Sequence, residues 1–185
     1  VLGALALLIF SPLMVVTAIA IKCTSTGPVF FKQPRHGWDG RVFEVYKFRS
    51  MYVHGEEAGK VTQATKDDPR ITSVGRLIRR LSIDELPQLF NVLDGTMSLV
   101  GPRPHAIAHN EFYSDKIDAY LSRHRIKPGM TGWAQIHGFR GETDTVEKMQ
   151  LRVQYDLEYI NTWSPWMDLK ILLRTPFSLF SDNAL

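Results

Sequence analysis

Two adjacent carboxylates, Asp84 and Glu85, are the residues of this sequence best suited to chemistry on a phosphate. They follow a basic run that contains Arg76, Arg79 and Arg80. Apolar residues then recur at positions 86, 89, 90 and 93, which is the spacing of one helix face anchored in a core. A helix starting here would hold both carboxylates in its first turn, where its positive dipole end and the arginines favour ionised carboxylates and bound phosphate.

The same residues also fit a purely structural role. Ser82 and Glu85 have the spacing of a capping box, in which both side chains accept hydrogen bonds from free backbone N–H groups at a helix start. On spacing alone, capping is the commoner role for such residues. Pro87 complicates the start of the helix, because a proline inside a helix removes a donor and crowds the preceding turn.

Other basic residues could supply donors to phosphate oxygens. Lys47 and Arg49 lie two residues apart on an expected strand and so share one face, although a solvated strand edge would look the same. Arg103 stands between two prolines that restrict the backbone and would aim its guanidinium at little entropic cost. Its planar fork matches phosphate or carboxylate oxygens in bidentate fashion, but an exposed arginine in a proline-rich turn is also ordinary.

The chain begins with an apolar segment that is long enough to enter a membrane. Residues 1–21 contain no charged side chain, and Lys22 ends the run. Pro12 cannot donate to the carbonyl one turn back, so a kink is expected, and the Ser11 hydroxyl could satisfy the carbonyl that the proline leaves free. Two outcomes follow: a kinked span, which is the commoner arrangement, or a helix that bends and returns to the side it entered.

The remaining patterns predict a mixed α/β fold dominated by helices. A single cysteine excludes an internal disulfide, and the formal charge of +3 with a pI near 9.0 suits phosphate-bearing ligands or an anionic membrane surface. Asp144 and Glu147 form a capping pair before a long helix, and Pro165 is placed to start the last one. The expected elements are strands at 29–33 and 41–48, a polar loop at 53–69, and helices at 73–80, 110–125 and 166–180.

Several motifs, in order along nearly the whole chain, resemble those of the bacterial sugar transferases, the monotopic phosphoglycosyl transferases. The matching segments are Ser11-Pro12, residues 26–33, 47–51, 84–88, 101–104, 127–133, 152–160 and 168–170. The resemblance implies a re-entrant membrane helix at residues 1–22, broken at Ser11 and Pro12, which overturns the preference for a kinked span. It also implies a transferase domain at residues 23–185 with interfacial amphipathic helices, on the cytoplasmic face of the bacterial inner membrane.

The family's reaction is the transfer of a sugar-1-phosphate from a UDP-sugar to undecaprenyl phosphate with release of UMP, the first step of exopolysaccharide, O-antigen or capsule assembly. The resemblance implies Mg²⁺, a lipid bilayer and a homodimer, and no nucleic acid partner. Asp84 would be the nucleophile that carries the phosphosugar, and Glu85 would help to hold the metal. The residues expected at substrate phosphates or the nucleotide are Lys47, Arg49, Arg79, Arg103 and Arg140, and those expected at the sugar or in structural contacts are Asp156 and Asp168.

The sugar and the reaction class have alternatives. Residues 105–111 and 138–145 resemble the colanic-acid-type branch of the family, which makes glucose-1-phosphate the first expectation. Galactose-1-phosphate or an N-acetylated sugar stays open, since the choice can rest on one or two hydrogen bonds. The rivals are a direct, single-step transfer with Asp84 as base or metal ligand, and a non-enzymatic, membrane-tethered module that binds anionic ligands.

Overall fold

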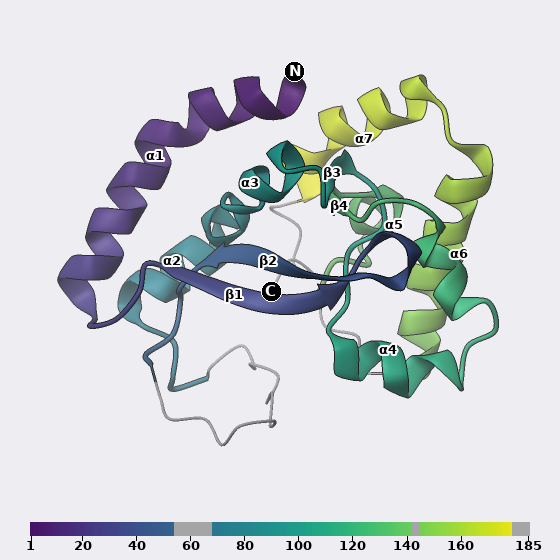
Figure 1. Ribbon diagram of the computed structural model, residues 1–185, viewed down its shortest axis with the longest axis horizontal. Helices are drawn as coiled ribbons and strands as arrows, with labels where there is room; N and C mark the ends of the chain where they lie inside the picture. The colour runs from purple at the N-terminus through teal and green to yellow at the C-terminus, as the bar shows by residue number, and fades with distance from the viewer. Residues whose placement is uncertain (54–67, 142–144, 179–185) are drawn as a thin grey trace.

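The computed structural model describes residues 1–53, 68–141 and 145–178 and confirms a helix-rich α/β fold (Figure 1). The predicted loop at 53–69 and Asp144 fall largely or wholly outside these residues. The helices are α1 (Leu2–Thr24), α2 (Ser73–Arg80), α3 (Gln88–Leu93), α4 (Ile107–Ser114), α5 (Trp133–Ile136), α6 (Val146–Thr162) and α7 (Pro165–Ser178); the strands are β1 (Phe30–His36), β2 (Val42–Phe48), β3 (Ser98–Val100) and β4 (Gly129–Thr131); and the 3-10 turns are η1 (Trp38–Gly40), η2 (Ile83–Glu85) and η3 (Tyr120–Arg125).

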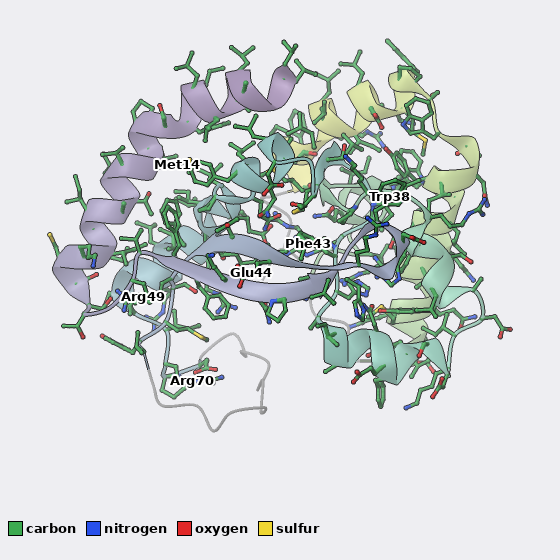
Figure 2. All side chains as sticks on the ribbon, viewed as in Figure 1. Met14, Trp38, Phe43, Glu44, Arg49 and Arg70 are labelled. Carbon is green, nitrogen blue, oxygen red and sulfur yellow. The ribbon has the colours of Figure 1, made fainter. Side chains whose placement is uncertain are left out.

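Helix α1 is long and apolar enough to cross a membrane by length and composition, and only 17% of its most apolar window is buried. It bends along its course, near Met14 (Figures 1 and 2). The Ser11 hydroxyl donates to the carbonyl of Leu8 at 2.8 Å, which is the carbonyl that Pro12 cannot reach. The predicted kink and its satisfied carbonyl are therefore confirmed.

Both ends of α1 pack against the rest of the chain. Near its start, a Cβ added to Gly3 would lie 2.8 Å from Cγ1 of Val92, so α1 and α3 touch closely there. Its second half contributes to a buried apolar cluster formed by Met14, Ile21, Phe48 and Ile78. The helix thus lies along the folded body at both ends instead of leaving it.

Strands β1 and β2 form the predicted antiparallel hairpin, with η1 at its tip. The register pairs Phe31 with Lys47 and Arg35 with Phe43. Because paired residues lie on the same face of a sheet and faces alternate along a strand, Arg35 and Lys47 share one face. This face bears basic side chains from both strands.

The segment that contains Asp84 and Glu85 differs from the sequence prediction in two ways. Ser82 has a left-handed backbone (φ 56°) and forms no side-chain cap, and α3 begins only at Gln88, so the capping box is wrong. On α3, Leu89 is buried, whereas Phe90 and Leu93 are 38% and 49% exposed, so only part of the predicted apolar face lies in the core. Asn91 takes the inner position, where its side chain bonds to the backbone of Tyr46 and Glu44.

The expected helix at 110–125 is also wrong. Helix α4 ends at Ser114, and Ala119 adopts a left-handed backbone (φ 58°) that no α-helix can continue through. The short turn η3 follows. The break lets residues from both sides enter one core against α6, formed by Tyr113, Ile117, Tyr120, Met149 and Val153.

The two C-terminal helices, α6 and α7, begin close to the positions predicted from the sequence. Thr145 caps α6 by accepting a hydrogen bond from the N–H of Lys148 at 3.2 Å, so it takes the capping place expected of Asp144. Pro165 starts α7 as predicted, and the Ser164 hydroxyl accepts from the N–H of Met167. These helices close a third core over the parallel pair β3–β4, formed by Val100, Tyr159 and Ile171.

Candidate active site

Glu85 lies at the meeting point of three basic side chains. Lys47 Nζ is 3.0 Å from Oε1, Arg103 grips both oxygens with Nη1 at 3.0 Å from Oε2, and Arg140 Nη2 is 3.4 Å from Oε2. All four side chains are largely buried, with the Glu85 carboxylate side chain 12% exposed. A carboxylate held by three cations in a water-poor setting is a strongly fixed group.

Different parts of the chain deliver these cations. Lys47 comes from β2, Arg103 from the proline-flanked segment after β3, and Arg140 from the segment after α5. Burial alone would raise the pKa of Glu85, but Arg103 and Lys47, with help from Arg140, hold it well below its usual range. Glu85 is therefore ionised across the physiological range.

Asp84 has a different environment although it is the next residue. Burial and the charge of Glu85 raise the pKa of Asp84 to about 6, against the attraction of Lys47, Arg79 and Arg103. Among the described residues, none donates a hydrogen bond to its carboxylate or forms an ion pair with it. Its neighbours Ile83 and Leu86 pack on the cluster that contains α1. Asp84 is thus a free carboxylate, ionised at neutral pH, on a turn anchored beside the apolar helix.

Arg35 is a site residue that the sequence reasoning missed. Its guanidinium donates to Gln33 Oε1 at 2.6 Å. Burial and the charge of Arg103 lower its pKa to about 10, with Glu85 acting in the opposite direction. The period-two spacing of Gln33 and Arg35 on a strand opposite Lys47 was the available signal, because it places all three on one face.

Two of the predicted phosphate-binding arginines stand apart from Glu85. Arg79, at the end of α2, acts on Asp84 by charge alone. Arg49 is buried at the lower end of α1 (Figure 2), where it donates to the carbonyls of Ser25 and Thr26. The structure therefore brings Lys47, Arg103 and Arg140 together and gives Arg49 a role in joining α1 to β1.

The two aspartates predicted for the sugar or for structure both make structural contacts. Asp156 is 2% exposed and accepts from Arg123 at 2.6 Å. Asp168 accepts from the hydroxyl of Tyr159 at 2.6 Å and from the indole of Trp163 at 3.2 Å, at the corner between α6 and α7. Both aspartates therefore make structural contacts, which was one of the two expectations for them.

Magnesium fits part of this site. Within the described ranges, no group of three or more His, Cys, Asp or Glu side chains could hold a metal ion. Mg²⁺ is often held by one or two carboxylates together with substrate phosphate oxygens, and the free carboxylate of Asp84 suits that use. Glu85 does not fit as a ligand while Lys47, Arg103 and Arg140 occupy its oxygens.

The chain is similar to known bacterial enzymes along its whole length. The family model described as "Bacterial sugar transferase" matches residues 1–182. A UDP-glucose:undecaprenyl-phosphate glucose-1-phosphate transferase of Escherichia coli is 57% identical over 100% of this chain and 39% of the relative's own length. A Caulobacter vibrioides protein of the same name is 52% identical over 98% of this chain and 68% of its own length.

Relatives with another sugar in their name also match. A UDP-N-acetylgalactosamine-undecaprenyl-phosphate N-acetylgalactosaminephosphotransferase of Aeromonas hydrophila is 44% identical over 92% of this chain and 40% of its own length. The chain thus spans about two fifths of the Escherichia coli and Aeromonas proteins. Because the family model matches residues 1–182, the chain belongs to the bacterial sugar transferase family.

Proposed function

We propose that this chain transfers glucose-1-phosphate from UDP-glucose to undecaprenyl phosphate and releases UMP. The observation that carries the proposal is the contrast at the acidic pair: a free Asp84 carboxylate beside Glu85, which holds three cations in place. The names of the Escherichia coli and Caulobacter vibrioides relatives support the substrates and the sugar.

The reaction proceeds in two displacements. An oxygen of Asp84 attacks the β-phosphorus of the UDP-sugar, and the bond from that phosphorus to the bridging oxygen breaks with UMP as leaving group. An oxygen of undecaprenyl phosphate then attacks the aspartyl phosphosugar, and the bond to Asp84 breaks and restores the carboxylate. Splitting the transfer in this way gives each step a good leaving group.

The cations at Glu85 can reduce the electrostatic repulsion between the attacking carboxylate and the diphosphate. A carboxylate that approaches a diphosphate is repelled unless fixed donors neutralise the phosphoryl oxygens. Lys47, Arg103 and Arg140 stand beside Asp84, and the buried Nη1 of Arg140 has no hydrogen-bond partner within the described residues, which leaves one donor of the site unused. When bound, Mg²⁺ would be held by Asp84 and the diphosphate and would withdraw further charge from the phosphates.

We also propose that α1 enters the membrane and returns to the cytoplasmic face. Its bend, the bond from Ser11 to Leu8, and its contacts with the folded body near both Gly3 and Ile21 support this arrangement over a crossing helix. A site beside α1 suits an acceptor whose chain stays in lipid while its phosphate lies at the interface. The homodimer and the inner membrane as location remain predictions of the family resemblance.

The test is UMP release from UDP-glucose, UDP-galactose and UDP-N-acetylated sugars with undecaprenyl phosphate and Mg²⁺. We expect release with UDP-glucose, loss of it in Asp84→Asn, and normal release in Asp118→Asn, a surface control of the same chemistry. Release with another sugar alone would keep the reaction and change the substrate. No release with any sugar would reject the enzyme and favour the anionic-ligand-binding module.

A further inference from the structure

A cluster of buried polar side chains lies directly behind the cations of the site. Its members come from the segment after β3, from α4, from η3 and from α6, and each is at most 5% exposed: His105, Asn110, Tyr120, Arg123, Arg152 and Asp156. Buried charges of this kind need partners, because moving them out of water is costly. Their partners include the backbone of the site itself.

Arg123 holds the segment that carries Arg103. Its Nη2 donates to the main-chain carbonyl of Arg103 at 2.8 Å and to Oδ2 of Asp156 at 2.6 Å. Its other terminal nitrogen contacts His105, two residues beyond Arg103. The guanidinium therefore fixes the backbone on which the Arg103 fork is mounted.

Arg152 does the same for the segment that carries Arg140. Its Nη2 donates to the carbonyl of Gly141 at 2.5 Å, which is the residue directly after Arg140. Its Nη1 lies 3.4 Å from Nε2 of His105, so the two arginines meet at one histidine. Arg152 and Asp156 are four residues apart on α6 and so lie on the same side of that helix.

This arrangement is a poor way to gain stability. Within the described residues, only Arg123 forms an ion pair with the buried carboxylate of Asp156, whereas Arg152 is held by the Gly141 carbonyl and by His105. The Nε of Arg123 and of Arg152 also lacks a partner within the described part of the chain. Buried ion pairs can often be replaced by apolar residues without loss of stability, even when every group is satisfied. What the cluster supplies instead is a fixed connection between two segments that stand 37 residues apart in sequence, at Arg103 and Arg140.

We propose that Arg123 and Arg152 are positioning residues: Arg123 fixes the Arg103 guanidinium at the phosphate site, and Arg152 fixes the Arg140 guanidinium there. The proposal rests on the proposed function, since it takes Arg103 and Arg140 to bind the phosphates of the UDP-sugar. Catalytic geometry is sensitive to displacements of about 1 Å, which can cost about a hundredfold in rate.

The test is a pair of double-mutant cycles read out as the dissociation constant of UDP, measured by calorimetry on the full protein in detergent. We expect Arg152→Met to weaken UDP binding by about tenfold and Arg140→Met by at least as much. If Arg152 acts through Arg140, the double variant binds no more weakly than Arg140→Met alone, because coupled residues are not additive. In the Arg103→Met background, Arg152→Met keeps its full effect.

Each outcome separates this proposal from the proposed function. If Arg103→Met and Arg140→Met leave UDP binding unchanged, the phosphate role of these arginines is wrong. If they weaken binding but the losses of Arg152→Met and Arg140→Met multiply, the positioning role is wrong.

A control variant and a substitute keep the test decisive. Tyr159→Phe removes another buried hydrogen bond of α6, the one to Asp168, and is expected to bind UDP like the wild type. An equal loss in Tyr159→Phe would attribute the effect to general stability and overturn the proposal. If Arg152→Met does not fold, Arg152→Lys enters the same cycles, since lysine keeps the charge and lacks the planar fork.

Discussion

The fold places two neighbouring carboxylates, Asp84 and Glu85, in environments that shift their pKa values in opposite directions. Three cations keep Glu85 ionised and fixed, whereas Asp84 has a pKa raised to about 6 by burial and by Glu85. Pairs of acidic groups whose pKa values are pushed apart by their surroundings often divide the roles of a mechanism. In the proposed mechanism, the fixed Glu85 organises the cations and the free Asp84 reacts.

The raised pKa of Asp84 predicts how activity depends on pH. Only the ionised carboxylate can attack phosphorus, so kcat/KM for UDP-glucose should fall as pH drops through about 6, tenfold for each pH unit below it. Initial rates of UMP release between pH 4.5 and 8 measure this limb. A profile that stays flat to pH 4.5 would show that no such carboxyl group controls the reaction.

The raised pKa of Asp84 also predicts how the stability of the fold depends on pH. The folded protein binds the Asp84 proton more tightly than the unfolded chain does, because the pKa rises from 3.8 to about 6 on folding. The charged form therefore destabilises the fold as pH rises through this interval, and the whole effect is present above about 6. Asp84→Asn should stabilise the metal-free protein by up to about 3 kcal/mol at pH 7.5 and by almost nothing at pH 4. Denaturant unfolding at both pH values checks this, and equal gains would contradict it.

Among the elements, those set by local sequence chemistry could be predicted and those set by packing could not. The hairpin, α2, the start of α7 and the Ser11 bond at the α1 bend follow from strand alternation and from proline chemistry. The capping box at Ser82 failed because distant cations compete for Glu85, and no local pattern reveals them. The helix at 110–125 failed because a left-handed Ala119 exists only where the surrounding core enforces it.

The candidate site shows the same division. Asp84 and Glu85 could be proposed as site residues from the sequence, because two adjacent carboxylates in a family motif stand at one position of the chain. The assembly of Lys47, Arg103 and Arg140 around one carboxylate, and the diversion of Arg49 to α1, depend on tertiary contacts. Arg35 was missed because its meaning emerges only from the strand register.

The bend in α1 predicts that both ends of this helix lie on the same side of the membrane. Single cysteines at positions 2 and 22, in a Cys23→Ser background, should both react with an impermeant maleimide from the cytoplasmic side. Replacing Ser11 and Pro12 together by alanine restores the helical bond to Leu8, straightens the helix and should make position 2 unreactive from that side. Labelling of the two positions from opposite sides in the unmodified helix would show a crossing helix.

Across the whole molecule, the site lies where separately built parts meet. The cluster around α1 carries Asp84 and Glu85, the core over β3 and β4 carries the segments of Arg103 and Arg140, and the core of α4, η3 and α6 supplies the buried arginines behind them. None of these parts holds the site alone. Its geometry therefore depends on how they dock, which favours buried polar connections over loose surface contacts.

The exposed apolar surface predicts how the molecule meets the bilayer. Helix α7 and the first half of α1 both run along the upper edge in Figure 1, and Trp166 and Phe177 on α7 are 74% and 80% exposed. In vesicles with brominated acyl chains, Trp166→Phe should remove most of the quenching of tryptophan fluorescence. Trp38→Phe, at the exposed hairpin tip, is the matched control and should remove little (Figure 2). The reverse result would place another surface in the lipid.

The proposed mechanism requires a covalent bond between Asp84 and phosphorus. The decisive measurement is to incubate the purified protein with UDP-glucose and Mg²⁺ in the absence of undecaprenyl phosphate, and to examine it by mass spectrometry and for released UMP. We predict about one UMP per protein and a glucose phosphate adduct on the peptide that contains Asp84, which disappears when undecaprenyl phosphate is added. Full turnover with the lipid, but neither burst nor adduct without it, would contradict the covalent mechanism and favour direct transfer.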